Sequence, residues 1–344
     1  MVLIKSIAGI RGTLENIPGQ SLSDQDISEI ILSYIEVVVN LSDTRTVIIG
    51  RDARPSGIRI SELITQLLID NGVDVIDLGL ATTPTIGISV KEYKASGAII
   101  ISASHNGIEW NALKLLNNKG EFLTEEISKK VIDHRQIKHK LKESKGKYLT
   151  ISTALEKHIK KILALDVVNQ EAIKLRNYSV VIDGINSVGG IALPMLLTAL
   201  GVNKIKKINC TPNGNFAHNP EPLPENIFQI KNLLKSGSFD FGIVVDPDVD
   251  RLCFVDEKGN PFGEEYTLVL AAKHVLEKKK ENVTCSNLSS SMALPKVTES
   301  LGGRHYFSAV GEINVVREMK KTNAIIGGEG NGGVIYPEIH YGRD

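Results

Sequence analysis

The sequence contains few cysteines, and their spacing argues against two kinds of cysteine site. Three cysteines occur in 344 residues, at Cys210, Cys253 and Cys285, and no pair has CxxC spacing. An odd number of widely spaced cysteines argues against both a disulfide framework and a zinc site, and it is typical of proteins in a reducing compartment. We therefore expect a cytoplasmic location.

Long apolar runs are also missing. No stretch of the chain approaches the roughly 20 apolar residues that a membrane-spanning helix needs. The apolar residues at the start of the chain are too few for the core of a signal peptide, and Arg11 interrupts them. These observations predict neither a membrane span nor a secretory leader.

An excess of one charge is missing as well. Lys and Arg total 40 and Asp and Glu total 40, so the formal net charge is zero. A neutral chain has no long-range attraction to nucleic acid or to an anionic membrane, and we expect neither partner. The composition is that of an ordinary globular protein, with 42% hydrophobic and 23% charged residues. The length of 344 residues suits two to three α/β units. The oligomeric state stays open.

Short β-branched runs alternate with longer helical patterns along the chain. This alternation is typical of βαβ units with mostly parallel sheets. The run TVIIG over 46–50 predicts a buried strand, and apolar residues at helical spacing predict a helix over 56–71 that ends at Gly72. Further strands are predicted at 73–78, 97–101, 178–184, 204–209, 241–245, 283–288 and 324–328, and further helices from about 190 and at 225–236, 264–278, 292–301 and 312–321.

Three domains follow from this pattern. The charged segment over 124–147 predicts a helix that runs into a linker, and the next strand pattern begins at 178. A third group of elements opens with the helix at 264–278. We therefore predict the class α/β, with three consecutive similar domains of mixed, mostly parallel sheets over residues 1–150, 151–259 and 260–344.

The first candidate site is the loop ISASHNG, which directly follows the strand at 97–101. Sheets of α/β proteins bind ligands beyond the carboxyl ends of their strands, which is where Ser104 stands. A serine needs an activating neighbour to act as a nucleophile or phosphate carrier, and His105 and Lys114 are close in sequence. Ser, His, Asn and Gly are also ordinary turn residues, so the loop alone is equally consistent with a polar turn.

The second candidate site is the loop DPDVDR, which directly follows the strand at 241–245. The carboxylates of Asp246, Asp248 and Asp250 can converge on one hard cation, and oxygen ligands favour magnesium or calcium over zinc. Arg251 adds a fork suited to phosphate. An EF-hand is excluded because its sixth position requires Gly and because the flanks predict strands. A charged surface turn is the weaker alternative, since the three carboxylates repel one another without a cation.

The third candidate site is the glycine-rich run GGEGNGG over 327–333. Glycines let the backbone approach a ligand closely, and Glu329 and Asn331 offer hydrogen bonds suited to sugar hydroxyls. The residues that follow do not open a helix, so the run does not match a dinucleotide fingerprint. Taken alone, it predicts a hairpin turn.

Two other glycine-rich runs carry weaker signals. The run GIRG over 9–12 predicts a tight turn that presents Arg11 either to a phosphate or to solvent. The run GINSVGG over 184–190 has spacing like a P-loop but lacks its Lys, so we interpret it as structural. Among the eight histidines, His105 alone falls in a candidate site.

The three loops, in this order and each after a strand, resemble the α-D-phosphohexomutase family. That family includes phosphoglucomutase, phosphomannomutase and phosphoglucosamine mutase. The resemblance extends from about Gly9 to the last residue. It rests on the motifs AGIRGT, IIGRDARPSG, ISASHNG, NALKLL, NPEPLPENI, DPDVDR, GGEGNGG and GRD.

The resemblance implies a role for each candidate residue and an active-site cleft between the domains. It implies a phosphoserine at Ser104 in the first domain, a magnesium loop in the second and a sugar-selecting loop in the third. The implied residues are Asp246, Asp248 and Asp250 as magnesium ligands, with phosphorylated Ser104 completing the metal site, Arg251 and Arg11 as active-site arginines, Lys114 for proton transfer, and Glu329 and Asn331 for sugar recognition.

The implied activity is the transfer of phosphate between carbon one and carbon six of a hexose phosphate. Phosphorylated Ser104 gives its phosphate to the free hydroxyl, and the other phosphate of the resulting hexose bisphosphate returns to the serine. Lys114 and His105 are both candidates to move the proton. The sugar stays open among glucosamine, mannose and glucose.

Two other functions stay open beside the mutase. In a magnesium-dependent sugar phosphatase, water would take the phosphate from Ser104. A non-catalytic fragment would only bind sugar phosphates, but the complete set of carrier serine, three aspartates and Arg251 argues against it.

Several residues depart from the family pattern. Gly107 stands where the family usually has Pro, which frees the backbone of the loop. Asn331 and Gly333 stand where Ser and His are common, and Glu312 stands where some relatives carry a His that is proposed to carry a proton.

The family also has a fourth domain that clamps the substrate's second phosphate. The sequence stops at Asp344 without such a segment. The expectation is a shortened chain with an incomplete third domain. Its mutase activity should be weak or absent, because binding energy from remote parts of the substrate would be lost.

Overall fold

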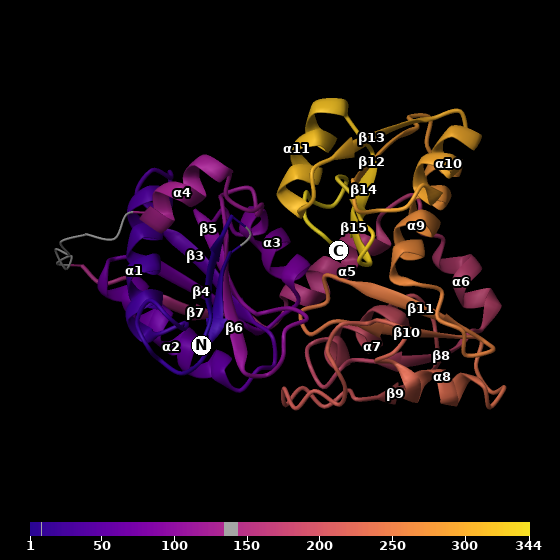
Figure 1. Cartoon of the computed structure of the whole chain (residues 1–344), viewed down its shortest axis with the longest axis horizontal. Coiled ribbons are helices and arrows are strands. Elements are labelled where there is room, and N and C mark those ends of the chain that lie inside the picture. The colour runs from indigo at the N-terminus through magenta and orange to yellow at the C-terminus, as the bar shows by residue number, and fades with distance from the viewer. Residues whose placement is uncertain (8, 134–143) are drawn as a thin grey trace. The chain divides into compact units, whose positions relative to one another are not determined.

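The structure is a computed structural model that describes residues 1–7, 9–133 and 144–344 (Figure 1). The chain forms two compact units, Met1–Leu155 and Glu156–Asp344, which are described in turn. Each unit combines helices with mixed sheets, which confirms the predicted α/β class. Of the helix and linker predicted over 124–147, the helix is α4 (Glu125–Asp133), and residues 134–143 lie outside the described residues.

A seven-stranded mixed sheet forms the centre of the first unit. Strands β5, β3, β4 and β7 are parallel to one another, and β6, β2 and β1 extend the sheet through antiparallel pairs. In spatial order the strands are β1 (Leu3–Ser6), β2 (Gly9–Thr13), β6 (Trp110–Leu116), β5 (Gly97–Ile101), β3 (Thr46–Arg51), β4 (Asp74–Leu80) and β7 (Tyr148–Thr150).

Hydrophobic cores form on both faces of this sheet. Val47 and Ile49 of β3 belong to one core, and Ile48 between them belongs to the other. A strand that is buried on both faces needs a continuous apolar run, which explains the sequence TVIIG. The first core includes residues of α1 (Asp24–Tyr34), the π-helical stretch η1 (Ile35–Val39), α2 (Ser56–Asp70) and α4, and the second includes residues of α3 (Thr83–Glu92).

Helix α2 illustrates how local sequence sets an element. Ile60, Ile64 and Leu68 recur every four residues and are fully buried on one face. Gly72 adopts a φ of 67°, and Val73 N donates to Leu68 O at 3.0 Å, which closes the end of the helix. The predicted helix and its glycine stop are therefore confirmed.

Two four-stranded sheets form the second unit. In each sheet three strands are parallel and one outer strand is antiparallel. The first sheet contains β11 (Leu252–Asp256), β10 (Phe241–Val245), β8 (Ser179–Asp183) and β9 (Lys204–Ile208) in spatial order. The second contains β13 (Arg304–Ser308), β12 (Val283–Asn287), β14 (Ile326–Glu329) and β15 (Gly333–Ile335).

The helices of this region are mostly those that the sequence predicts. Helix α9 has the predicted bounds, and α7, α8, α10 and α11 begin within three residues of the predicted positions. The helices are α5 (Ala154–Leu163), α6 (Gln170–Arg176), α7 (Gly189–Ala199), α8 (Phe228–Leu234), α9 (Glu264–Lys278), α10 (Ala293–Ser300) and α11 (Glu312–Thr322).

The predicted tight turn at Gly9–Gly12 is wrong. These residues belong to β2, which pairs with β1 and β6. A Cβ at Gly9 would lie 2.7 Å from Leu113 O, and one at Gly12 would lie 2.7 Å from Leu22 N. The two glycines therefore allow close approach of backbone within the sheet, and they do not make a turn.

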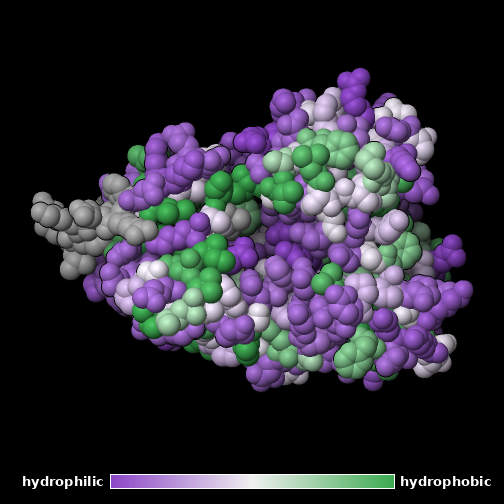
Figure 2. All heavy atoms as spheres, in the orientation of Figure 1, coloured by the Kyte–Doolittle hydropathy of each residue, from purple (hydrophilic) through white to green (hydrophobic). Residues whose placement is uncertain are grey.

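Within the three described ranges, no helix is both long enough and apolar enough to cross a membrane. Figure 2 shows a face on which hydrophilic side chains predominate and hydrophobic ones reach the surface in scattered groups. The exposed large hydrophobic residues are spread along the chain, and they include Leu41, Leu175 and Leu288.

Candidate active site

Ser104 stands in the loop after β5, at the carboxyl end of a buried strand. Its backbone φ is 49°, in the left-handed region that non-glycine residues rarely adopt, and its side chain is buried. Asn106 N donates to Ala103 O at 3.1 Å, and Ser104 N donates to Ser102 Oγ at 3.0 Å. A conformation of this kind persists only where the surroundings fix it, and it is common at functional sites.

Arg54 fixes this loop. Its side chain is 0% exposed, and its Nε donates to Asp52 Oδ2 at 3.0 Å. A guanidinium presents five donors in one rigid plane, so a single side chain can set several peptide groups at once. The terminal nitrogens donate to three carbonyls of the loop and to the first carbonyl of β6: Nη2 to Ser104 O (2.7 Å) and Asn106 O (2.6 Å), and Nη1 to Gly107 O and Trp110 O (3.0 Å).

Asp52 extends this network to the start of the loop, directly after β5. Its Oδ2 also accepts from Ser102 Oγ at 2.7 Å, and its Oδ1 accepts from Arg54 N at 3.0 Å. Because β3 and β5 are parallel neighbours, residues just after each strand meet at the same edge of the sheet. The sequence motif IIGRDARPSG contains both residues, but its pattern predicted a role for neither. The signal was an Asp and an Arg directly after a buried strand.

Gly107, where the family usually has Pro, is held in place as well. Its carbonyl accepts from Arg54 Nη1 and from Trp110 N (3.2 Å). The freedom that the sequence predicted for this glycine is therefore limited by Arg54.

The register of the sheet places Arg11 and Lys114 on one face. Arg11 lies opposite Ala112, and Lys114 is two residues further along β6. Opposite residues of an antiparallel pair, and residues two apart on one strand, share a face. Arg11 Nη1 also donates to Asn106 Oδ1 at 3.4 Å. Arg11 therefore reaches the loop over 102–109 that contains Ser104, which we call the serine loop. His105 follows Ser104 in that loop and is half-buried.

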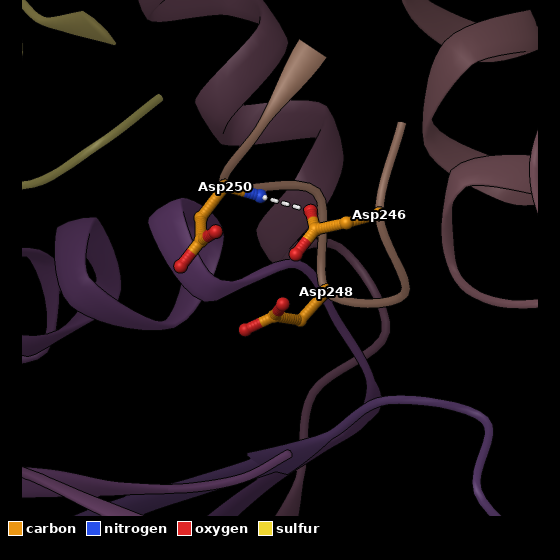
Figure 3. Close-up of side chains that lie close together, drawn as sticks. All are labelled: Asp246, Asp248 and Asp250. Atoms are coloured by element: carbon orange, nitrogen blue, oxygen red, sulfur yellow. Dashed lines mark hydrogen bonds between the residues drawn. The ribbon is translucent and has the colours of Figure 1, made fainter. Parts of the chain in front are cut away.

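The second unit holds Asp246, Asp248 and Asp250 in the loop between β10 and β11 (Figure 3). One carboxylate oxygen of each residue lies within 4.8 Å of the others, and all three residues are buried. Asp246 Oδ1 accepts from the backbone N of Asp250 and of Arg251, both at 3.1 Å. These hydrogen bonds curl the loop, and Val249 at its tip has a φ of 57°.

This arrangement fits a hard cation. Three buried carboxylates repel one another, and a divalent ion would compensate their charge with the oxygen ligands that magnesium and calcium prefer. The strands β10 and β11 are antiparallel neighbours, so the loop is a strand connection and not the loop between two helices of an EF-hand. The residues that are present could therefore hold a metal ion.

The run GINSVGG supports this loop. Ser187 Oγ donates to Pro247 O at 2.6 Å, and both groups are buried. A Cβ at Gly190 would lie close to the backbone of Cys210, so the glycine allows close packing. The structure agrees with the structural interpretation of this run.

Arg251 is paired with carboxylates on two sides. Its Nη1 donates to Glu221 Oε1 at 2.8 Å, and its Nε lies 3.9 Å from Asp250 Oδ1. Glu221 belongs to the stretch NPEPLPENI, which carried part of the sequence resemblance. A phosphate bound by Arg251 would therefore compete with Glu221 for the same guanidinium.

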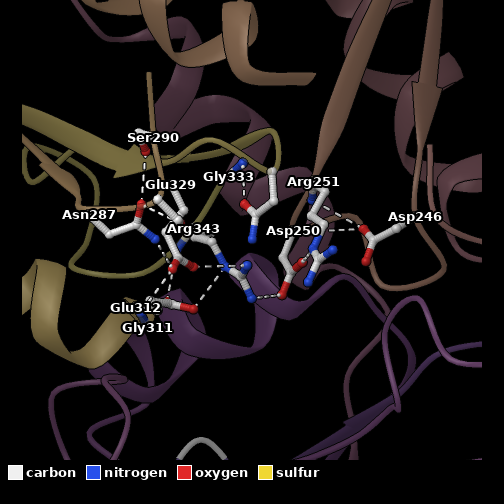
Figure 4. A network of polar contacts seen from close by, with 12 residues as sticks. Asp246, Asp250, Arg251, Asn287, Ser290, Gly311, Glu312, Glu329, Gly333 and Arg343 are labelled. Atoms are coloured by element: carbon white, nitrogen blue, oxygen red, sulfur yellow. Dashed lines mark hydrogen bonds and ion pairs between the residues drawn. The ribbon is translucent and has the colours of Figure 1, made fainter. Parts of the chain in front are cut away.

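The glycine-rich run forms the hairpin between β14 and β15, as the sequence alone predicts (Figure 4). Glu329 ends β14 and is buried. Its Oε1 accepts from Asn287 Nδ2 at 2.7 Å and from Gly311 N at 3.1 Å. Asn331 lies in the turn, where its Oδ1 accepts from Gly333 N at 3.2 Å. Glu329 is therefore a structural link as well as a candidate sugar ligand.

Arg343 contacts residues of both loops, and sequence reasoning missed it. It is buried, its Nη2 donates to Asp250 Oδ2 at 2.8 Å, and its Nη1 lies 3.5 Å from Glu329 Oε2. Its Nε lies 2.9 Å from Glu312 Oε2. Burial alone would lower the pKa of Arg343, but the charges of Asp250, Glu312, Glu329 and Asp246 outweigh it and raise the pKa, so the side chain stays protonated.

Three family models match consecutive parts of the chain. They describe the α/β/α domains I, II and III of phosphoglucomutase/phosphomannomutase, and they match residues 4–142, 156–259 and 263–344. The matches together account for nearly the whole sequence.

Curated relatives carry related names. A phosphoglucomutase/phosphomannomutase from Thermococcus kodakarensis is 35% identical over 301 residues, which are 87% of this chain and 65% of the relative. A phosphoglucosamine mutase from Methanococcus maripaludis is 32% identical over 305 residues, which are 86% of this chain and 66% of the relative. The chain therefore spans slightly less than two thirds of the length of these relatives.

A solved structure has the same fold. It is that of a protein from Thermus thermophilus assigned as a phosphomannomutase, with a TM-score of 0.89 and 23% sequence identity. The likeness covers 100% of this chain and 77% of that one. At this identity the likeness supports the fold.

Proposed function

The chain belongs to the phosphoglucomutase/phosphomannomutase family, and we propose that it acts as a phosphohexose mutase. In this proposal phosphate moves between carbon one and carbon six of a hexose phosphate through a phosphoserine at Ser104. The observation that supports it most is the serine loop itself. Ser104 has a left-handed backbone, and Arg54 holds its carbonyl and those of three neighbours.

The reaction consists of two transfers. The oxygen of the free hexose hydroxyl attacks the phosphorus, the bond from phosphorus to Ser104 Oγ breaks, and the hydroxyl proton passes to a base. The product is a hexose bisphosphate. In the second transfer Ser104 Oγ attacks the other phosphate, and the released sugar oxygen takes back a proton.

Lys114 is our first candidate for moving the proton. It is buried and shares a face of the sheet with Arg11, which reaches the serine loop. An amine at this place could take up the hydroxyl proton in one transfer and return it in the other. His105 is the second candidate because it adjoins Ser104 in the chain.

Arginines would bind the phosphate. Arg251 and Arg11 each present a fork of donors that matches phosphate oxygens. Arg251 follows the three aspartates directly, and its Nε lies 3.9 Å from Asp250 Oδ1. We therefore assign Arg251 to the transferring phosphate.

The metal is proposed to be Mg²⁺, held by Asp246, Asp248 and Asp250, with an oxygen of the Ser104 phosphate as a further ligand. Carboxylate oxygens in a curled, buried loop fit a small hard cation. When bound, the ion would compensate the negative charge of the transferring phosphate.

The sugar is proposed to meet Glu329 and Asn331. Asn287 and Gly311 hold Glu329 Oε1, so the carboxylate has a fixed position toward which a sugar hydroxyl could donate. The substrate class is a hexose monophosphate, and the names of the relatives include mutases of glucose, mannose and glucosamine phosphates.

The test measures both products of the purified chain with each of the three hexose monophosphates, Mg²⁺ and a trace of the matching bisphosphate. A mutase isomerises at least one sugar phosphate and releases little inorganic phosphate, and Ser104→Ala abolishes the isomerisation. Ser236→Ala, an exposed serine of the second unit whose Oγ donates to Leu233 O, serves as the matched control. Inorganic phosphate as the main product would instead identify a phosphatase.

A further inference from the structure

The side chain of Arg343 contacts both a proposed metal ligand, Asp250, and a proposed sugar ligand, Glu329 (Figure 4). We propose that it is a positioning residue that couples the metal loop, residues 246–251, to the sugar loop, residues 327–333. The proposal rests on the function proposed above for Asp250 and Glu329. It adds that the orientation of Asp250, and hence metal affinity, depends on Glu329 through Arg343.

The geometry of the guanidinium carries this proposal. Nη2 donates to Asp250 Oδ2 at 2.8 Å, Nη1 lies 3.5 Å from Glu329 Oε2, and Nε lies 2.9 Å from Glu312 Oε2. Arg343 N also donates to Glu312 Oε1 at 3.2 Å, so Glu312 binds both the backbone and the side chain. The donors of a guanidinium are fixed in one plane. If one of the three carboxylates shifts, the guanidinium turns with it, and its hydrogen bonds to the other two carboxylates change.

The neighbouring contacts make Glu329 a firm anchor. Its Oε1 is held from two other segments, by Asn287 at the end of β12 and by Gly311 at the start of α11. The two loops also meet through the backbone, since Leu252 N donates to Gly332 O at 3.2 Å. A Cβ at Gly332 would lie 2.5 Å from Leu252 O, so only a glycine allows this approach.

Through Arg343, the binding of a sugar would change the affinity for the metal ion. If a sugar hydroxyl donates to Glu329 Oε2, it competes with Arg343 Nη1 for that oxygen while Oε1 stays held, so the position of Arg343 and Asp250 changes, and the affinity for the cation changes with it. Coupling of this kind is reciprocal, so the cation must affect sugar binding by the same factor. Partners that orient metal ligands typically change metal affinity by about 10- to 100-fold when they are substituted.

The experiment measures Mn²⁺ affinity by electron paramagnetic resonance, without substrate and without reference to activity. The proteins are the unsubstituted chain, Arg343→Lys, Glu329→Gln and the double variant. Arg343→Lys keeps the positive charge but cannot reach three carboxylates in one plane. Arg317→Lys is the matched control, because this exposed arginine lies on α11 and donates to Asn314. Thermal unfolding of each protein reports folding.

We expect Arg343→Lys to weaken Mn²⁺ binding about tenfold and Arg317→Lys to leave it unchanged. Glu329→Gln should weaken binding about fivefold in the unsubstituted chain and less than about twofold in the Arg343→Lys background. Equal effects of Glu329→Gln in both backgrounds would overturn the coupling, and so would an affinity of Arg343→Lys within twofold of the unsubstituted chain.

Three outcomes separate a failure to fold, a failure of the metal site and a failure of the coupling. If Arg343→Lys does not fold, Glu329→Gln alone decides, because unchanged Mn²⁺ affinity in that variant contradicts the coupling and a fivefold loss supports it. If the unsubstituted chain binds no Mn²⁺, the metal site of the proposed function fails together with the coupling. If that chain binds Mn²⁺ and Arg343→Lys binds it equally well, the coupling alone fails.

Discussion

Replacing Arg54 tests how the serine loop is held. Arg54→Met removes a fully buried charge that pairs with Asp52 and takes one donor from each of four carbonyls, of which Gly107 O keeps its bond from Trp110 N. Breaking a buried ion pair by removing one partner costs about 3–5 kcal/mol, and each carbonyl that water cannot reach adds about 1 kcal/mol or more. Of the four bonds, the one to Ser104 O is buried and the other three are part-buried, so one carbonyl adds to the cost of the broken ion pair. We therefore expect the free energy of unfolding of the first unit to fall by about 4–6 kcal/mol.

The assay is urea unfolding followed by tryptophan fluorescence. Trp110 is the one tryptophan of the sequence, it belongs to the first unit, and its carbonyl accepts from Arg54, so its signal reports this region. Arg59→Met is the matched control, because Arg59 pairs with Asp24 on the surface with about half of each side chain exposed. The control should lose less than about 0.5 kcal/mol. A loss below about 1 kcal/mol in Arg54→Met would refute the role of Arg54 as the anchor of this loop.

Three further outcomes follow from the structure. Gly97→Ala should destabilise the first unit by about 2–3 kcal/mol in urea unfolding, because its Cβ would overlap Tyr34 Oη and Leu116 O, and a loss under 0.5 kcal/mol would contradict this packing. Burial lowers the pKa of His305 to about 4, so the unfolded chain binds more protons between about pH 6.5 and 4 and stability falls as the pH drops through that window. Between pH 7 and 5 the loss through His305 should be about 1–2 kcal/mol, and His305→Gln should lose that much less, whereas identical pH profiles would exclude the effect. Asp248→Asn should weaken Mn²⁺ binding about tenfold or more without lowering the melting temperature of the metal-free protein, and unchanged affinity would remove Asp248 from the metal site.

Much of the fold is visible in the sequence because single strands and helices have strong local patterns. Strand β3 is buried on both faces and needs the continuous run TVIIG, and α2 shows its buried face every four residues and a glycine stop. The N-terminal hairpin was missed because its glycines resemble turn residues. Gly9 and Gly12 are needed inside the sheet, because the backbone of β6 and of Leu22 lies too close to them for a side chain.

The candidate site also contains residues that the sequence could predict and residues that it could not. The aspartates of the metal loop are close in sequence, so their convergence in the second unit could be predicted from spacing. Arg54 and Arg343 act on groups that are 50 and 93 residues away, and no local pattern marks such pairs. Glu312 departs from the family pattern at a position where some relatives carry a His, and the structure shows that its carboxylate holds Arg343 by two contacts.

The central claim is that Ser104 carries the phosphate, and mass spectrometry of the peptide that contains Ser104 tests it most directly. The protein would be measured as purified and after incubation with Mg²⁺ and each of the glucose, mannose and glucosamine bisphosphates, with Asp248→Asn in parallel. We expect one phosphate on Ser104, which one bisphosphate renews faster than the others do, and we expect this renewal to be slower in Asp248→Asn. Phosphate on another residue, or none with any bisphosphate, would contradict it.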